Sequence, residues 1–428
     1  MKYLQSDKKR FEQDLDKFLI LRKNKLKNNS KSVLNIIRDV KKNGDKALLK
    51  YEKRFNDNSI IIPSKKQISK SILNLDKKVK KAIDQAYNRI YKFHSLQKFK
   101  DISYVDKLKN KIDYRHIALE SVAIYVPGST VSYPSSVLMN AIPALVAGVK
   151  RVVMINPGYK GRQNPAVLYA AKKCKIKEIY SIGGPSAIAA ITYGTKKIKA
   201  VNKIVGPGNS YVATAKKEVF GDIGIEGMTA GPSEVTIVCD KNSNPAWIAS
   251  DLIGQAEHDI LAQCILISKD KKLIEKVKLE VFKQLKDINR SSIAKKSLLN
   301  NGILMYISSD NKIVQVINKI GPEHLELNIK NYKTFVSKIK NAGSICLGKY
   351  AVMALTDYGV PGTNHVLPTN TTSKYSSGLS VSEFLKKISY ITLSKKGIDK
   401  LGPSAITLAN YEGLQGHAQS IIKRIRRK

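Results

Sequence analysis

Gln255 and His258 lie three residues apart in a segment where Ala, Ile and Leu recur at three- and four-residue intervals, which predicts a helix. Residues three apart share one helix face, so the carboxamide oxygen and the imidazole nitrogen would point the same way. Such a pair is half of a zinc site, because zinc takes four ligands. A polar helix end at the protein surface is the alternative interpretation of these two residues taken alone.

A second pair of ionisable side chains, Glu323 and His324, follows Gly321-Pro322. The proline fixes the turn that presents them. A histidine can take a proton from an alcohol at neutral pH, and a nearby glutamate can activate water. The pair therefore predicts acid–base chemistry, with an ordinary surface turn as the alternative.

Asp357 lies in a Gly- and Pro-rich stretch, residues 356–365, and Glu412 and His417 lie in another stretch punctuated by glycine. Loops of this kind concentrate functional groups. Four side chains from these segments would make a mixed nitrogen and oxygen set suited to zinc: Gln255, His258, Asp357 and His417.

The elements that must position these residues have the rhythm of an α/β protein. From residue 121, strands alternate with Gly/Pro turns and helices, and a second series of the same rhythm begins at residue 235. We therefore expect two Rossmann-like parallel-sheet lobes, one inserted in the other. The expected division is a helical N-terminal arm (1–22), a domain carrying most site residues (23–124 and 235–378), an inserted domain (125–234) and a helical C-terminal segment (379–428).

One strand-to-helix turn in the inserted domain has a composition that suits phosphate binding. Gly206-Pro207-Gly208-Asn209 follows the expected strand 203–205 and could bring backbone N–H groups and a helix N-terminus against a phosphate. The usual G-x-G-x-x-G fingerprint is absent, so an ordinary tight turn is the alternative.

The charge of the chain is strongly positive, with 75 Lys and Arg against 34 Asp and Glu, a formal net charge of +41. The lysines are spread along the whole chain without aromatic interleaving, which argues against a nucleic-acid partner. A positive field would still attract an anionic dinucleotide.

The composition also bears on location. No apolar run is long enough to span a membrane, and no signal peptide begins the chain. The four scattered cysteines favour buried reduced thiols, and hence the cytoplasm.

Several motifs in this sequence, taken together, resemble histidinol dehydrogenases. The resemblance covers nearly the full chain in the right order, and the run from Pro134 to Ala144 is long enough to exclude chance. The motifs lie at residues 125–128, 134–144, 205–209, 231–235, 255–258, 322–326, 364–369 and 412–414.

The resemblance implies an enzyme that uses one zinc ion per subunit and NAD. Its substrate would be L-histidinol, oxidised through L-histidinaldehyde to L-histidine by two sequential hydride transfers, the last steps of histidine biosynthesis. It also implies a homodimer in which the C-terminal segment carries His417 into the partner's site.

By motif position, the resemblance also implies roles for single residues. His324 would deprotonate the alcohol, and Glu323 would activate water for the second oxidation. The inserted domain would bind NAD. The implied zinc ligands are Gln255, His258, Asp357 and His417; the implied substrate contacts are these four with Ser233, His324 and Glu412; the implied NAD-contact positions are Tyr125, Ser186 and Asn209.

Three positions depart from the family pattern. Ser186 stands where the family has a glutamine that contacts NAD, and a serine is too short for the same contact without water. Asp259 and Thr356, each beside an implied zinc ligand, replace glycines.

Two other functions remain as alternatives. A related zinc and NAD dehydrogenase could act on another small polar alcohol, although Glu412 favours an amino alcohol because a carboxylate can pair with its ammonium group. A basic nucleic-acid-binding protein that has lost catalysis would show a salt-dependent DNA shift and no NADH production.

Overall fold

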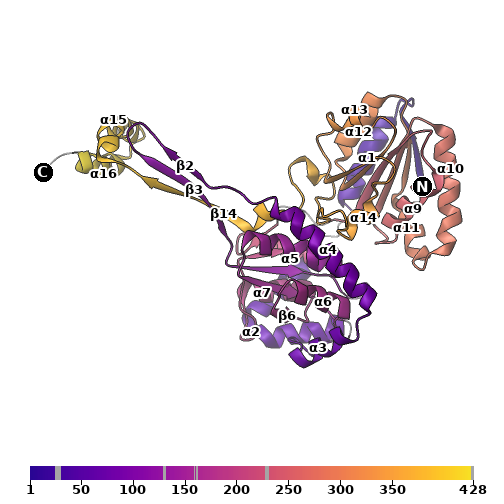
Figure 1. Ribbon diagram of the computed structural model, residues 1–428, viewed down its shortest axis with the longest axis horizontal. Coiled ribbons are helices and arrows are strands. Elements are labelled where there is room, and N and C mark those ends of the chain that lie inside the picture. The colour runs from indigo at the N-terminus through magenta and orange to yellow at the C-terminus, as the bar shows by residue number, and fades with distance from the viewer. Residues whose placement is uncertain (25–29, 129–131, 159, 161, 227–230, 426–428) are drawn as a thin grey trace.

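The computed structural model describes residues 1–24, 30–128, 132–158, 160, 162–226 and 231–425. Figure 1 shows three parts: a lobe around a sheet that we name sheet A, a lobe around sheet C, and an arm built on sheet B with helices at its tip. No helix in these residues is long and apolar enough to cross a membrane.

Sheet A has six parallel strands in the order β1-β11-β10-β9-β12-β13. Helices α1 and α12 cover one face, and α9, α10 and α11 cover the other. The strands are β1 (Lys2–Gln5), β9 (Glu234–Cys239), β10 (Gln263–Ser268), β11 (Ile303–Tyr306), β12 (His324–Asn328) and β13 (Ser344–Leu347). The helices are α1 (Phe11–Asn24), α9 (Pro245–Ala256), α10 (Lys271–Gln284), α11 (Ser291–Asn301), α12 (Asp310–Ile320), α13 (Lys333–Val336) and α14 (Met353–Asp357).

Sheet C has five parallel strands in the order β6-β5-β4-β7-β8. Helices α3, α4, α5 and α6 cover one face, and α2, α7 and α8 cover the other. The strands are β4 (Ser121–Tyr125), β5 (Arg151–Ile155), β6 (Glu178–Tyr180), β7 (Lys203–Val205) and β8 (Gly224–Ile225). The helices are α2 (Ser30–Asn56), α3 (Lys65–Leu73), α4 (Lys77–Ser95), α5 (Pro134–Ala147), α6 (Pro165–Lys173), α7 (Gly184–Tyr193) and α8 (Ser210–Glu218).

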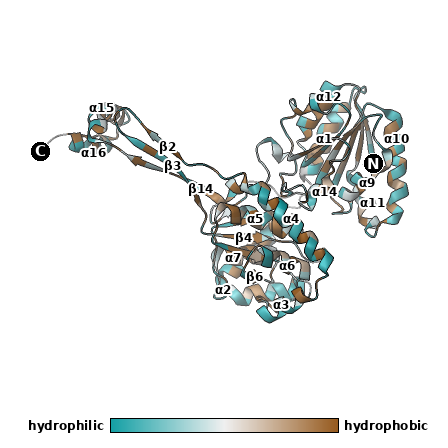
Figure 2. Cartoon of the chain, in the orientation of Figure 1, coloured by the Kyte–Doolittle hydropathy of each residue, from teal (hydrophilic) through white to brown (hydrophobic). Residues whose placement is uncertain are grey.

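The predicted fold class is confirmed. Both lobes are parallel α/β sheets, and strands β4–β8 of sheet C follow the same spatial order as β9–β13 of sheet A. Sheet C lies in the chain between β1 and β9, so its lobe is inserted in the other. Figure 2 shows apolar strands inside each lobe and polar residues along the outer helices, as this layering requires.

The packing of the N-terminal half differs from the expected division of the chain. Residues 23–124 were expected to join residues 235–378, but Val33 and Leu48 of α2 and Ile90 of α4 are buried in the two cores of the sheet C lobe. The expected arm, 1–22, instead packs on sheet A: β1 pairs with β11, and Leu15 is fully buried beside it. The sequence of an amphipathic helix shows that one face is apolar, but it does not indicate which sheet that face will cover.

The arm is an antiparallel sheet, sheet B, in the order β14-β3-β2. The C-terminal segment, 379–428, was expected to be mostly helical, and α15 and α16 agree with this, but it also contains strand β14, eight residues of which pair with β3. Ile388, Tyr390 and Ile391 explain the strand, since β-branched and aromatic residues favour a pleated surface. The remaining elements are β2 (Ile102–Val105), β3 (Lys111–Ala118), β14 (Leu385–Thr392), α15 (Lys395–Tyr411), α16 (Gln415–Ile425) and the short 3₁₀ helices η1 (Leu285–Asp287), η2 (Thr372–Lys374) and η3 (Val381–Phe384).

Candidate active site

The amino ends of two neighbouring strands of sheet A bring three of the predicted site residues together. Val235 of β9 pairs with His324 of β12, so the residues just before them meet at the same edge. The Ser233 hydroxyl donates to Glu323 Oε2 at 2.9 Å, and the Glu234 backbone N–H donates to the same oxygen at 2.8 Å. The contact between Ser233 and Glu323 joins segments that lie ninety positions apart in the sequence.

A carboxylate lies between two histidines at this edge. Asp357, the last residue of α14, has Oδ1 3.6 Å from His324 Nε2 and Oδ2 3.8 Å from His258 Nε2. Burial, with the charges of His365 and His258, lowers the pKa of His324 to about 3, and burial also lowers the pKa of His258. Both shifts favour the uncharged imidazole, which has a lone-pair nitrogen that can bind a metal ion.

Gln255 lies in the last turn of α9, three residues before His258, and its side chain is fully buried. Neither its oxygen nor its nitrogen has a hydrogen-bond partner in the described part of the chain. Buried polar atoms are rarely left without a partner, so this amide fits a ligand that the protein alone does not supply.

The donor set also fits zinc in type and spacing. Two ligands about 2 Å from a zinc ion at tetrahedral angles lie roughly 3.3 Å apart. The 3.8 Å between His258 Nε2 and Asp357 Oδ2 is close to that spacing. Over residues 1–24, 30–128, 132–158, 160, 162–226 and 231–425, no group of three or more His, Cys, Asp and Glu side chains is arranged to hold a metal ion. A site here would therefore use the Gln255 amide and at least one further ligand.

His417 and Glu412 lie far from the other candidates within one chain. Both side chains are exposed, His417 on α16 and Glu412 just after α15. These helices form the tip of the arm, away from α9 and α14 (Figure 1). The structure of a single chain therefore does not bring them to the site.

His365 is a candidate that the sequence left without a role, although it is one of only six histidines and lies in the same Gly/Pro-rich stretch as Asp357. Its Nδ1–H donates to the Asp357 backbone carbonyl at 2.6 Å, and its Nε2 lies 3.4 Å from the Ser136 hydroxyl of α5. Burial lowers the pKa of His365 to about 4. His365 thus links the end of α14 to the sheet C lobe.

A buried arginine that the sequence did not single out lies behind Glu323. Arg22 Nη1 is 2.6 Å from Glu234 Oε2 and donates to Gln263 Oε1 at 2.8 Å, and its Nε donates to Asn370 Oδ1. Glu234 Oε1 in turn accepts from the backbone N–H groups of Asn370 and Glu323. Burial and the charge of Glu234 raise the pKa of Glu323 well above its usual value.

Arg22→Met should destabilise the protein by about 3–5 kcal/mol, because it leaves the buried Glu234 carboxylate without its cation. The measurement is urea unfolding at pH 7. Lys283→Met is the matched control: it breaks the exposed pair with Glu280 and should change stability by less than about 1 kcal/mol. Equal changes in the two variants would contradict the importance of the buried pair.

The residues implied in NAD binding lie at the carboxyl ends of the sheet C strands. Tyr125 ends β4, and its hydroxyl accepts from the Gly184 N–H at 3.1 Å. Asn209 follows β7, is exposed, and caps α8 by accepting from the N–H groups of Tyr211 and Val212. Strands β4 and β7 are neighbours at which the strand order reverses, which is where open α/β sheets bind ligands.

Ser186 is placed differently from Tyr125 and Asn209. Its side chain is buried in the first turn of α7, and its hydroxyl donates to the Gly183 carbonyl at 3.0 Å. The hydroxyl thus supports the Gly183-Gly184 turn from inside.

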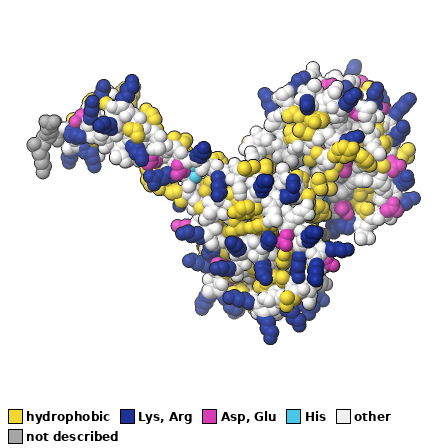
Figure 3. Space-filling view, viewed as in Figure 1, with side chains coloured by type: hydrophobic (Ala, Val, Ile, Leu, Met, Phe, Trp, Pro, Cys, Tyr) yellow, Lys and Arg dark blue, Asp and Glu magenta, His cyan; other side chains and the backbone are white. Residues whose placement is uncertain are grey.

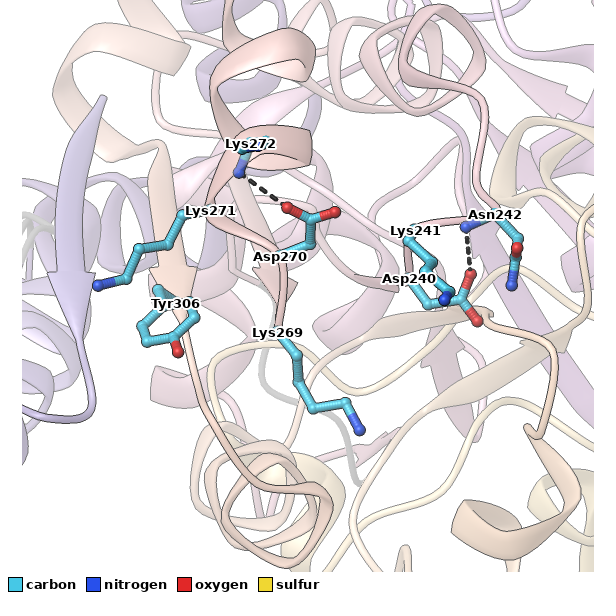
Figure 4. Close-up of a pocket in the computed structure, with 8 residues that line it drawn as sticks. All are labelled: Asp240, Lys241, Asn242, Lys269, Asp270, Lys271, Lys272 and Tyr306. Atoms are coloured by element: carbon cyan, nitrogen blue, oxygen red, sulfur yellow. Dashed lines mark hydrogen bonds between the residues drawn. The ribbon is translucent and has the colours of Figure 1, made fainter.

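A surface hollow of about 490 Å³ lies at the opposite, carboxyl edge of sheet A, and none of the candidate residues lines it (Figure 4). Asp270 caps α10 there by accepting from the Lys272 N–H. Two of its lysines are already paired, Lys269 with Asp310 and Lys271 with Asp7. The candidate catalytic and metal-binding residues therefore do not line this hollow at the carboxyl edge of sheet A.

Figure 3 shows Lys and Arg side chains dispersed over both lobes and the tip of the arm on the face in view. A nucleic-acid-binding protein would instead gather them along one groove or stripe.

Comparison with known proteins gives one consistent family. The family model for histidinol dehydrogenase matches residues 21–425. The chain is 76% identical to the histidinol dehydrogenase of Pelagibacter ubique (strain HTCC1062) over the full length of both chains. It is 43% identical to that of Brucella abortus (strain 2308), with 97% of each chain covered. The crystal structure of histidinol dehydrogenase from Elizabethkingia anophelis matches with a TM-score of 0.92 at 34% identity, covering 99% of this chain and 98% of that one.

Proposed function

The chain belongs to the histidinol dehydrogenase family of oxidoreductases, and we propose that it oxidises L-histidinol to L-histidine through L-histidinaldehyde, with zinc and NAD, in two hydride transfers. The observation that carries the proposal is the convergence of Glu323, His324, Asp357 and His258 at one edge of sheet A.

His324 is the base in this proposal. A neutral imidazole is required to take the alcohol proton, and burial keeps His324 neutral. Its Nε2 lies beside Asp357, and its Nδ1 has no partner in the described part of the chain. The same base serves both oxidations, because the hydrated aldehyde also loses a hydroxyl proton as hydride leaves.

Glu323 is the residue that activates water for the second oxidation. Ser233 and the Glu234 N–H hold one of its carboxylate oxygens, which fixes the direction of the other. Ser233 also contacts substrate in this proposal, and so does Glu412, whose carboxylate would pair with the substrate ammonium group.

In this proposal each subunit would hold one zinc ion through four side chains: Gln255, His258, Asp357 and His417. Bound there, zinc would coordinate the imidazole and amine of the substrate and so orient the alcohol carbon. Tyr125 and Asn209 would contact NAD at the carboxyl edge of sheet C, and Ser186 would act there through the Gly183-Gly184 turn.

The proposal includes a homodimer with shared active sites. The tip of the arm exposes Tyr411, at 92%, and Leu408, at 62%, next to Glu412. Strands β2 and β14 also expose apolar side chains, including Ile102 and Ile391. A second copy that received this arm would cover these side chains and gain His417.

Residues 371–380 are rich in Ser, Thr and Gly, a composition that by itself predicts a flexible hinge for that exchange. In the structure Thr371 and Thr372 are buried, and the neighbouring Asn370 is tied to Glu234. Sheet B therefore carries the tip outward in place of a flexible linker. We also propose a cytoplasmic location, in keeping with four free cysteines that are all buried.

The direct test is the yield of NADH per L-histidinol consumed. The proposed double oxidation gives two NADH, and the purified protein should reach that ratio with zinc present. A yield of one with accumulation of the aldehyde, or turnover only with a different alcohol, would refute it. A chelator should remove activity and added zinc should restore it.

A further inference from the structure

Two carboxyl groups, each with one oxygen shielded from solvent, lie one helical turn beneath the candidate metal site. Asp251 comes from α9 and Glu326 from β12, and Glu326 is only 1% exposed. The two side chains lie near enough for each to shift the pKa of the other. Because two carboxylates contain no donor, a hydrogen bond between them requires a proton on one of them.

The protein environment favours that shared proton. Burial raises the pKa of Asp251 to about 6, and burial with the charge of Asp251 raises that of Glu326 to about 8. Asp251 Oδ2 and Glu326 Oε2 are both buried, and neither has a hydrogen-bond donor in the described part of the chain, so a proton shared between the two groups would satisfy both. The pair is thus a carboxylic acid bound to a carboxylate, and not a salt bridge.

Glu326 also forms a hydrogen bond to a third element, helix α14. Glu326 Oε1 accepts the backbone N–H of Met353 at 2.6 Å, and Met353 is the first residue of α14. That short helix ends at Asp357. Asp251 precedes Gln255 by four residues on α9, and Glu326 follows His324 by two on β12, so each carboxyl lies on the same face as a site residue.

We infer that Asp251 and Glu326 are positioning residues for metal binding: their hydrogen-bonded carboxyl pair fixes α9, β12 and α14 at the spacing that lets Gln255, His258 and Asp357 reach one ion. The inference rests on the proposed function, which supplies the ligand set. Groups that orient metal ligands from behind typically change metal affinity by about 10–100-fold when removed.

Three variants test this role in metal-free protein titrated with zinc against a chelating competitor. Glu326→Gln keeps an oxygen for the Met353 N–H and supplies an amide N–H to Asp251, so zinc affinity should stay within a few-fold of wild type. Glu326→Leu removes both contacts and should weaken zinc binding about 10–100-fold. Ser268→Ala is the control, because it deletes a buried hydrogen bond to Cys239 at the opposite edge of sheet A. It should lower stability and leave zinc affinity unchanged.

Hydrogen exchange of α14 in the metal-free protein separates this inference from the proposed function. The Met353 amide should exchange faster in Glu326→Leu than in wild type, and at the wild-type rate in Glu326→Gln. Wild-type zinc affinity in Glu326→Leu, or equal weakening in Glu326→Gln, would overturn the positioning role. If the wild-type protein binds no zinc, the proposed metal site is wrong, whereas the exchange rates still show whether the pair holds α14.

Discussion

His324→Ala should lower the rates of both oxidations by about 10²–10⁴-fold, the range that general-base catalysis supplies. In the proposed reaction both steps need a hydroxyl proton removed, and the buried, neutral His324 beside Asp357 is the proposed base. Single-turnover assays started separately from histidinol and from histidinaldehyde measure the two steps. His116→Gln is the control, because this histidine lies on β3 of the arm and stacks on Phe99.

Glu323→Gln should instead affect the aldehyde step far more than the alcohol step, because only the former needs an activated water. Burial and Glu234 raise the pKa of Glu323, and only the ionised carboxylate can accept a proton from water. The wild-type aldehyde step should therefore lose rate as the pH falls, beginning at a higher pH than an ordinary glutamate would give. Equal losses in both steps for Glu323→Gln would refute the division of roles.

The local part of this site could be predicted from the sequence. Gln255 and His258 are close in the chain and Glu323 and His324 are adjacent, so each pair stays together, although α9 ends at Ala256 and His258 lies just beyond it and not on a shared helix face. The alternation of strands and helices likewise gave the two parallel lobes. These features depend on periodicity and turn composition, which are properties of short segments.

The other features of the fold and of the site depend on contacts between distant segments. A single sequence has no local pattern that indicates such contacts. Arg22 meets Gln263 across 241 positions, and nothing around Arg22 distinguishes it from the many other cations of this chain. Helices α2 and α4 were assigned to the wrong sheet for the same reason. Strand β14 is exposed along nearly its whole length, and the adjacent Lys386 and Lys387 interrupt its apolar residues, so the sequence shows no alternating buried face that would predict a strand.

The position of His417 leads to a second prediction, which concerns the activity recovered when two inactive variants are mixed. His258 lies in the sheet A lobe and His417 at the tip of the arm, so one chain does not bring them together. His258→Ala and His417→Ala should each bind less zinc and lose activity. If each site combines His258 of one chain with His417 of the other, a mixed dimer has one site with both defects and one with neither.

Random pairing makes half of the dimers mixed, so about a quarter of all sites should recover after subunit exchange between the two variants. Activity and zinc content should rise together toward that fraction, while either variant alone stays inactive. The double variant His258→Ala/His417→Ala mixed with either single variant is the control, since no pairing of those chains yields an intact site. Mixed dimers seen by mass spectrometry without recovery would place His417 in its own chain's site. The arm would then have to fold back onto its own sheet A lobe. That rearrangement would require one of two changes: β14 or β2 separates from β3, or sheet B bends where it leaves the sheet C lobe.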